Sequence, residues 1–213
     1  SSAASDVYKR QKQGVRAAAY MLEDDKRYHL VRALSQIARR PELNDPEWVR
    51  ANAEATRGLF KANEQEVLRI GRDMYDAPDE IISLDHVLGW MKKVTASGVK
   101  ILVVDPITNV DTGKEPWNTE KQFLAKAKTI LRRTYSTLVL VTHPKSNIPE
   151  NQIPRLDQMA SSLAYPRFSQ SCFWLRFNKP EKRRKVRTLM GTTEEQVDRM
   201  MYIRKARNSS AAT

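Results

Sequence analysis

The chain has 213 residues, a formal net charge of +12 at pH 7, 40% hydrophobic residues and 29% charged residues. This length is enough for one domain with a hydrophobic core, and no apolar run reaches the roughly 18 residues that a membrane-spanning helix needs. The positive charge indicates an anionic partner, most commonly nucleic acid, although a solvated basic surface is the plainer interpretation.

The two ends of the chain differ from its middle. Residues 1–11 start small and polar, and they resemble the translated adaptor sequence found at the ends of metagenomic reads. We therefore interpret them as a non-native or disordered leader and leave them out of the fold. Residues 209–213 predict a disordered tail. On this interpretation the chain is a gene fragment, and a motif that it lacks can have been lost by truncation.

The first half of the chain alternates between strand and helix patterns. The apolar run at residues 15–22 predicts a buried strand, and the spacing of Leu30, Leu34 and Ile37 predicts a helix that ends near Arg39. The same signals predict a helix over residues 47–61, a strand over residues 66–75 and an amphipathic helix from Leu84 to near Gly98.

The second half contains the clearest strand, residues 99–105, whose unbroken apolar core suits a parallel sheet covered on both faces. A helix over residues 119–135 and an apolar strand over residues 137–142 follow, which predicts strand–helix–strand units. The later predicted elements are a short helix over residues 156–163, strands over residues 172–177 and 186–190 around a basic hairpin at residues 178–185, and a strand over residues 200–205. The predicted fold class is α/β, a mostly parallel sheet flanked by helices, with a C-terminal β-hairpin.

Three polar side chains lie at the ends of predicted strands: Glu23, Asp105 and His143. Ligands of open α/β sheets bind beyond the carboxyl ends of the strands, so the three positions support one another. At such a place Asp105 can hold Mg²⁺ or its water beside nucleotide phosphates. Glu23 can activate a water that attacks the γ-phosphate, and His143 can sense that phosphate.

Each of these positions also has a plainer interpretation. Asp105 precedes a proline, as acids in strand-ending turns often do, and His143 can lack a function. Beside Glu23, Asp24 or Asp25 can cap the next helix. The other two histidines, His29 and His86, fall in predicted helices and are interpreted as packing or surface residues.

Positive charge is concentrated near the C-terminus, where residues 151–213 hold 13 basic and 5 acidic residues. Lys205 and Arg207 lie at the end of the last predicted strand. From there they can reach a phosphate in a neighbouring subunit, as an arginine finger supplied in trans does. The alternative is a solvated basic surface.

The chain contains no G-x-x-x-x-G-K-[ST] phosphate loop. Its only Gly-Lys pair is Gly113-Lys114, and no glycine stands five residues before it. Without the backbone N–H groups and the lysine of such a loop, nothing cradles the β- and γ-phosphates. We therefore expect this chain alone to bind ATP weakly or not at all, and to be inactive.

In this order and spacing, the features resemble the RecA-like ATPase core of hexameric replicative helicases. These P-loop NTPases include the DnaB-type helicases and the related RepA-like phage and plasmid ATPases. The segment YMLED is similar to the one with the family's catalytic glutamate, which implies that role for Glu23. ILVVDP is similar to the Walker B strand and implies the Mg²⁺ site at Asp105, and VTHPK is similar to the sensor strand that ends at His143.

Two further segments extend the resemblance to about residue 208. MASSLAYPRFSQSCFWL resembles the family's Gly-Ser helix and the strand after it, although Ala-Ser replaces Gly-Ser. RKARN resembles a Lys-x-Arg-Asn-Gly segment, with Ser209 in place of the glycine, and implies the trans finger at Lys205 and Arg207. Similarity to the RepA-like group adds Arg167 as a second finger candidate.

The resemblance implies a DNA-replication motor that uses ATP and Mg²⁺ and moves on single-stranded DNA. It implies a homo-oligomeric ring, a hexamer, in the cytoplasm of a bacterial or phage-infected cell. Residues 12–208 would form a partial domain without its first strand and phosphate loop. The family's central DNA loops favour Lys145 and Arg155 as DNA contacts, and the basic run Lys182, Arg183 and Arg184 is a second candidate, with a solvated turn as its alternative.

Two other interpretations stay open. One is a recombinase-type or clock-type RecA-like ATPase. The other is a non-catalytic, basic nucleic-acid-binding protein that keeps the sheet without hydrolysis. A phosphate loop encoded within ~40 residues upstream, after a strand, would favour the motor.

Overall fold

The computed structural model of the chain describes residues 14–78, 81–145, 148, 155–160, 162–177, 183–188, 191–196 and 199–206. The chain divides into two compact units, Ser1–His143 and Pro144–Thr213. The predicted leader and tail lie outside the described residues, and the domain limits of 12 and 208 stay a prediction.

The first unit contains a four-stranded sheet in the order β2-β1-β3-β4, and every neighbouring pair is parallel. The strands are β1 (Ala17–Met21), β2 (Met74–Asp76), β3 (Ile101–Asp105) and β4 (Thr137–Leu140). The register places Met21 opposite Asp105, so β1 and β3 end side by side. The predicted α/β class with a parallel sheet is confirmed.

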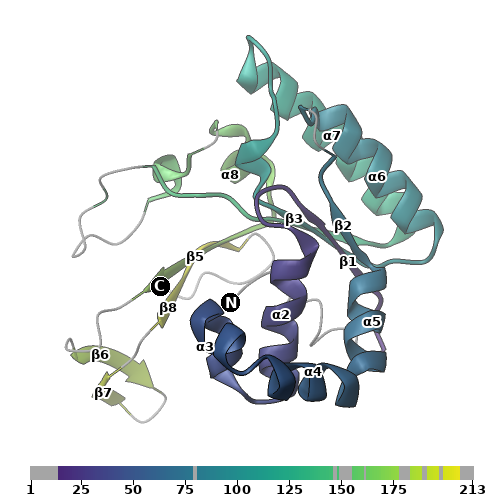
Figure 1. Cartoon of the computed structure of the whole chain (residues 1–213). Helices are drawn as coiled ribbons and strands as arrows, with labels where there is room; N and C mark the ends of the chain where they lie inside the picture. The colour runs from purple at the N-terminus through teal and green to yellow at the C-terminus, as the bar shows by residue number, and fades with distance from the viewer. Residues whose placement is uncertain are drawn as a thin grey trace. The chain divides into compact units, whose positions relative to one another are not determined.

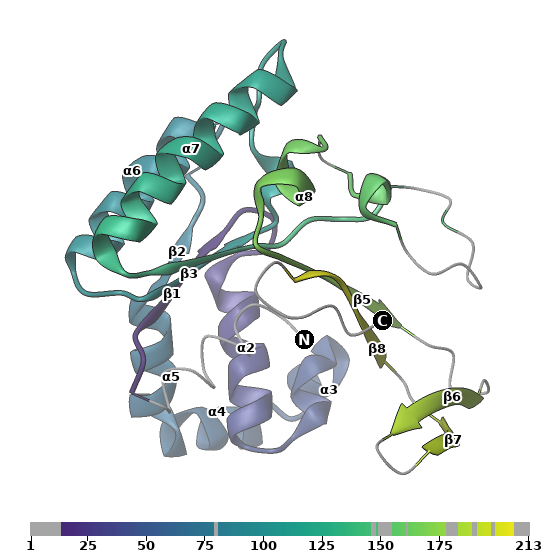
Figure 2. The ribbon, with the colours of Figure 1, turned by 180° about the vertical axis from the view of Figure 1, so that it is seen from behind.

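Helices cover both faces of this sheet, with α2 (Lys26–Ile37) and α5 (Glu64–Arg72) on one face and α6 (Leu84–Ala96) and α7 (Pro116–Thr134) on the other (Figures 1 and 2). The predicted helix over residues 119–135 is confirmed as α7. It starts earlier than predicted, because Pro116 suits the first turn of a helix. The remaining elements of this unit are η1 (Pro41–Asn44), α3 (Pro46–Ala51), α4 (Ala53–Ala62) and η2 (Ile107–Asn109).

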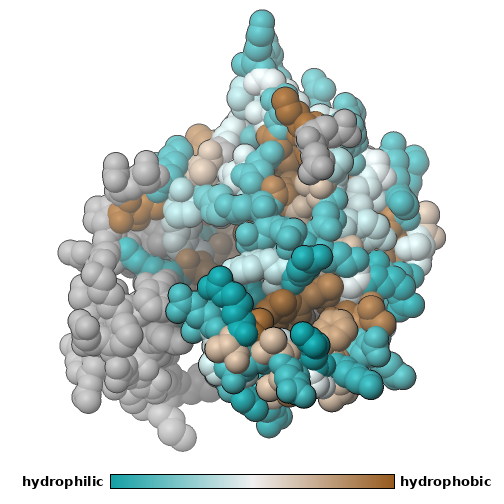
Figure 3. Space-filling view, in the orientation of Figure 1, coloured by the Kyte–Doolittle hydropathy of each residue, from teal (hydrophilic) through white to brown (hydrophobic). Residues whose placement is uncertain are grey.

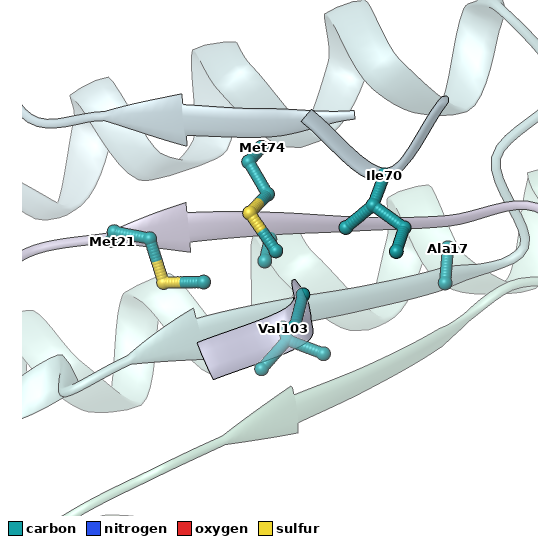
Figure 4. Close-up of a cluster of buried hydrophobic side chains, with 7 residues drawn as sticks. Ala17, Met21, Ile70, Met74 and Val103 are labelled. Carbon is teal, nitrogen blue, oxygen red and sulfur yellow. The ribbon is translucent and has the colours of Figure 1, made fainter. Parts of the chain in front are cut away.

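The central strand β1 is buried from both sides, which explains its unbroken apolar sequence. On one face, Met21 packs in a cluster with Met74 and Val103 of the neighbouring strands and with Ile70 of α5 (Figure 4). On the other face, the Tyr20 ring stacks on Trp90 of α6, with ring centroids 5.2 Å apart. Alternate residues of one strand thus enter two separate packing layers.

The predicted strand over residues 66–75 is wrong, because most of this segment forms helix α5 and only the three residues of β2 are extended. Val67 and Ile70 lie one helical turn apart, and both are fully buried. Arg69 pairs with Glu66 across the same turn at 2.7 Å. Burial at a spacing of three, with acids in the first turn and bases in the last, favours a helix.

The predicted helix over residues 47–61 is divided at Asn52 into α3 and α4. The backbone N–H and the side-chain amide of Asn52 both donate to the Trp48 carbonyl, each at 2.9 Å. This side-chain bond competes with helix continuation and ends α3.

The second unit contains two antiparallel pairs, β5 (Ser171–Phe177) with β8 (Arg199–Ala206) and β6 (Arg183–Thr188) with β7 (Gly191–Gln196). The predicted C-terminal hairpin is confirmed, but its strands are β6 and β7. The expected pairing of residues 172–177 with 186–190 is wrong, and residues 183–185 belong to a strand. The β6–β7 register puts Arg184 opposite Glu195, whereas β5 and β8 bring apolar residues opposite one another.

The predicted helix over residues 156–163 is replaced by η3 (Leu156–Gln158) and α8 (Ala164–Phe168). The Ser162 hydroxyl accepts a hydrogen bond from the Ala164 N–H at 3.1 Å at the start of α8. No helix among the described residues combines the length and hydropathy needed to cross a membrane. Figure 3 shows a face on which hydrophilic residues predominate between smaller hydrophobic areas.

Candidate active site at the carboxyl end of the parallel sheet

The carboxyl ends of β1, β3 and β4 meet at one edge of the sheet. Hydrogen bonds continue the strand pairing past the last strand residues: the Leu22 N–H donates to the Asp105 carbonyl at 2.8 Å, and the Val141 N–H donates to the Val104 carbonyl at 2.9 Å. Residues that follow three different strands are therefore held at this edge.

Glu23 and His143 contact each other directly. His143 Nε2 lies 3.2 Å from Glu23 Oε2, although 120 residues separate the two in sequence. Their side chains are 55% and 51% exposed, so a ligand can approach both. The pair leaves Glu23 Oε1 outside this contact, and an imidazole N–H at Nε2 can donate either to the carboxylate or to another acceptor.

Asp105 ends β3 and is partly buried between the strands that lead to Glu23 and His143. Its bond to Pro106 is cis. The residues that the structure describes contain no group of three or more His, Cys, Asp or Glu side chains able to hold a metal ion. Magnesium commonly binds through one or two carboxylates, waters and substrate phosphates, so one carboxylate at this position fits such a site.

His29 is a neighbour of this edge that the sequence did not single out. It lies in the first turn of α2 and is only 5% exposed, so the prediction that it packs is confirmed. Burial lowers the pKa of His29, while the charges of Asp105 and Asp24 act in the opposite direction. Its buried Nδ1 has no hydrogen-bond partner among the described residues.

The structure tests the predicted cap of α2 and shows a cap of α6 that was not predicted. The Asp25 carboxylate accepts a bond from the Tyr28 N–H at 2.7 Å, which confirms it as the helix cap. His86 forms a capping box with Ser83 at the start of α6, and the Ser83 N–H donates to its Nδ1 at 3.1 Å. Capping therefore accounts for Asp25 and His86, and it leaves Glu23 for the site.

The finger candidates lie in the second unit. The Lys205 ammonium donates to the Pro166 carbonyl and, at 3.0 Å, to the Arg167 carbonyl. These carbonyls belong to the last turn of α8, so Lys205 is tied to the end of the helix that carries Arg167. The Arg167 residue is exposed. Arg207 lies outside the described residues.

The two favoured DNA-contact candidates converge on one acidic residue, Asp157. The Lys145 ammonium donates to the Asp157 carbonyl at 2.8 Å. Arg155 Nε and Nη2 donate to Asp157 Oδ1 and Oδ2 at 3.1 and 3.0 Å. Of the second candidate group, Lys182 lies outside the described residues, and Arg183 and Arg184 lie on β6.

No protein-family model and no curated protein matches the chain. Solved structures with a similar fold include an ATPase domain, with a TM-score of 0.69 and 11% identity over 98% of this chain and 72% of that one. They also include a DnaB-like replicative helicase, described with its interactions with primase, with a TM-score of 0.71 and 11% identity over 95% of this chain.

The fold is therefore that of the RecA-like ATPase domains of DnaB-like replicative helicases, as the resemblance in sequence predicted. The chain spans 48% of the helicase chain, about half its length. At 11% identity the likeness concerns the fold. The roles of individual residues depend on the geometry at the edge of the sheet.

Proposed function

We propose that the chain is part of an ATP-hydrolysing motor of the DNA-helicase type that moves on single-stranded DNA. One observation carries the proposal: Glu23 and His143 meet at 3.2 Å beside the strand that ends at Asp105. A carboxylate that orients water, a second carboxylate for magnesium and a polar sensor are among the side chains that phosphoryl transfer to water uses.

Bound MgATP would supply the phosphoanhydride bond whose cleavage drives the motor. Glu23 orients the attacking water and accepts its proton, and Oε1 is the atom left for this task while Oε2 faces His143. Asp105 would hold the metal or one of its waters. When a phosphate oxygen is present, the His143 N–H can donate to it instead of to Glu23, which links the sensor to the base.

A further strand beside β4 would bring a phosphate loop to this site. Val103 of β3 and Val139 of β4 are paired residues of the same type, yet Val103 is 4% exposed and Val139 is 43% exposed. Within the described sheet, β4 pairs only with β3. Parallel sheets of this kind are normally covered, so the apolar edge of β4 is a suitable place for the strand that precedes the loop.

The cations of the second unit would complete the site of an adjacent subunit. Lys205 and Arg207 are the finger candidates, with Arg167 as a second one, and the Lys205 ammonium also bonds the end of the helix that carries Arg167. A finger that enters the next subunit's site requires a heterologous interface, and such interfaces build a ring, such as a hexamer, or a filament. Lys145 and Arg155 would contact the phosphates of the DNA strand.

The test uses a protein that joins this chain to a phosphate loop. Glu23→Gln is expected to lower kcat by about 10²–10⁴-fold while ATP still binds, because only the proton acceptor is lost. Glu54→Gln, an exposed residue on α4, is the matched control and should keep full turnover. Turnover that survives Glu23→Gln would remove Glu23 from the mechanism.

The 213-residue chain alone provides a second test. We expect weak or undetectable ATP binding in equilibrium dialysis, since its sequence contains no phosphate loop. Micromolar affinity would contradict this expectation. DNA binding without any hydrolysis by the longer protein would instead favour a non-catalytic nucleic-acid-binding protein, which the charge of +12 also suits.

A further inference from the structure

Asp157 is the meeting point of the two cations to which we assign DNA contact, and this inference rests on that proposed function. An antiparallel β-bridge pairs Pro144 with Met159, next to these residues in the chain. The Lys145 ammonium donates to the Asp157 carbonyl, and the Arg155 guanidinium donates to the Asp157 carboxylate through two nitrogens. One acidic residue is therefore held among the groups that would receive a phosphate.

The contact with Arg155 has the geometry of phosphate recognition. Nε and Nη2 form one edge of the guanidinium, and this edge binds carboxylates and phosphates alike with two parallel hydrogen bonds. In the described structure, the carboxylate of Asp157 fills that edge. A phosphate that binds there has to replace a group of the same shape and the same sign of charge.

This replacement requires little free energy. The Arg155 and Asp157 side chains are 63% and 50% exposed, and ion pairs this exposed contribute little to stability. Lys145 is held differently, since it donates to a neutral backbone carbonyl and an ammonium has three donors. Lys145 can therefore add a phosphate without losing its anchor, whereas Arg155 has to exchange partners.

We propose that Asp157 occupies the phosphate-binding edge of Arg155 in the DNA-free chain and that a bound strand displaces it. The carboxylate lowers the affinity for single-stranded DNA and reduces its dependence on salt. The opposite role, in which Asp157 orients Arg155 toward the strand, predicts the opposite sign for removal of the carboxylate charge.

The experiment measures binding of the 213-residue chain to a fluorescein-labelled oligothymidylate by fluorescence anisotropy over a series of salt concentrations. Asp157→Asn removes the charge and keeps the backbone carbonyl that Lys145 bonds. The interaction of two unit charges about 4 Å apart in water corresponds to about a fivefold change in Kd, so we expect about fivefold tighter binding at low salt. The slope of log K against log salt should steepen by up to about 0.7, the value for one added phosphate contact on a single strand.

The matched control is Asp85→Asn, which makes the same change in net charge. Asp85 lies on α6, pairs with Lys126 at 3.3 Å and is exposed like Asp157. Its substitution should change the Kd far less, because the effect of Asp157 acts through Arg155 and not through total charge. In an Arg155→Ala background, Asp157→Asn should give no gain beyond that of Asp85→Asn.

The outcomes separate the inference from the proposed function. The inference that a bound strand displaces Asp157 is overturned if Asp157→Asn has the same Kd as Asp85→Asn, or a higher Kd than the unsubstituted chain. Either result leaves the proposal of DNA binding intact. An unsubstituted chain without salt-dependent binding overturns both. A gain that persists in the Arg155→Ala background also overturns the inference. Circular dichroism of each variant checks that the fold is kept.

Discussion

The parallel sheet of the first unit and the β5–β8 sheet of the second are both rich in apolar residues, but they differ in how these residues are covered. In β1, the apolar residues pack on both faces against helices α2, α5 and α6. In the β5–β8 sheet, one face carries two cross-strand apolar pairs, Phe173 with Ile203 and Leu175 with Met201, and all four are exposed. The opposite face, with Trp174 and Tyr202, is partly buried.

The difference shows that an apolar strand sequence indicates side chains that favour burial, but it does not indicate which part of the protein buries them. The first unit supplies its own helices. Among the described residues of the second unit, nothing buries the four side chains, and exposed patches of this kind are typical of contact surfaces. Substitutions that compare equal residues in the two sheets test this view.

The largest expected effect is a difference between two isoleucines. Ile70 is fully buried in the first unit, and Ile203 is 62% exposed in the second. Ile70→Ala should lower the free energy of unfolding by about 2–5 kcal/mol, because it leaves a cavity in the cluster around Met21 and Met74. Ile203→Ala should change it by less than about 0.5 kcal/mol.

Urea denaturation followed by circular dichroism measures both values for the isoleucine pair. A large loss for Ile203→Ala would mean that the exposed face of β5–β8 is covered in solution, for instance by a second copy of the chain. In that case the loss should depend on protein concentration, whereas the loss for Ile70→Ala should not.

A smaller difference is expected between two aspartates that each pair with an arginine. Asp73 is almost fully buried and lies 3.0 Å from Arg16, whereas Asp157 and its partner Arg155 are half-exposed or more. Asp73→Asn should cost about 1.5–3 kcal/mol of unfolding free energy, since it weakens a charged hydrogen bond that a buried carboxylate accepts. Asp157→Asn should cost less than about 1 kcal/mol.

The same denaturation series measures the aspartate pair. Equal costs for the two variants would contradict the assignment of one pair to the folded core and of the other to an exposed, exchangeable contact.

Much of the first unit follows from its sequence, because its strands are local apolar runs separated by helices. The placement of Glu23 and His143 at one edge was predictable, since the carboxyl ends of parallel strands share an edge. Their contact at 3.2 Å was not predictable, because it depends on how the backbone turns after β1 and after β4. The prediction of a strand over residues 66–75 was wrong because β2 follows α5 directly. The ten-residue segment therefore combines the spacing of buried residues in a helix with that in a strand.

The second unit was harder to predict for a physical reason. Strand β5 pairs with β8, and the hairpin β6–β7 lies between them in sequence. Local sequence patterns predict where strands form, but they do not predict which distant strand pairs with each of them. The anchoring of Lys205 on α8 and the pairing of Arg155 with Asp157 likewise depend on tertiary contacts that a count of charges does not contain.

The smallest expected effect is a pH dependence that belongs to the first unit, which contains all three histidines of the chain. Burial lowers the pKa of His29 below its ordinary value of 6.5. The unfolded chain then binds more protons at this residue than the folded chain, so the free energy of unfolding rises with pH up to about 6.5 and falls as the pH drops below it. His29→Asn should flatten this dependence between about pH 5 and 6.5, since asparagine does not titrate.

Denaturation at a series of pH values measures the slope for the unsubstituted chain and for His29→Asn. Asp105 and Asp24 oppose the effect of burial, so the slope reports the balance between desolvation and the carboxylates near the edge of the sheet. A slope that His29→Asn leaves unchanged would show that these carboxylates offset burial completely. A steeper slope after Asp105→Asn, compared with Asp85→Asn, would place the charge of Asp105 close to the buried imidazole.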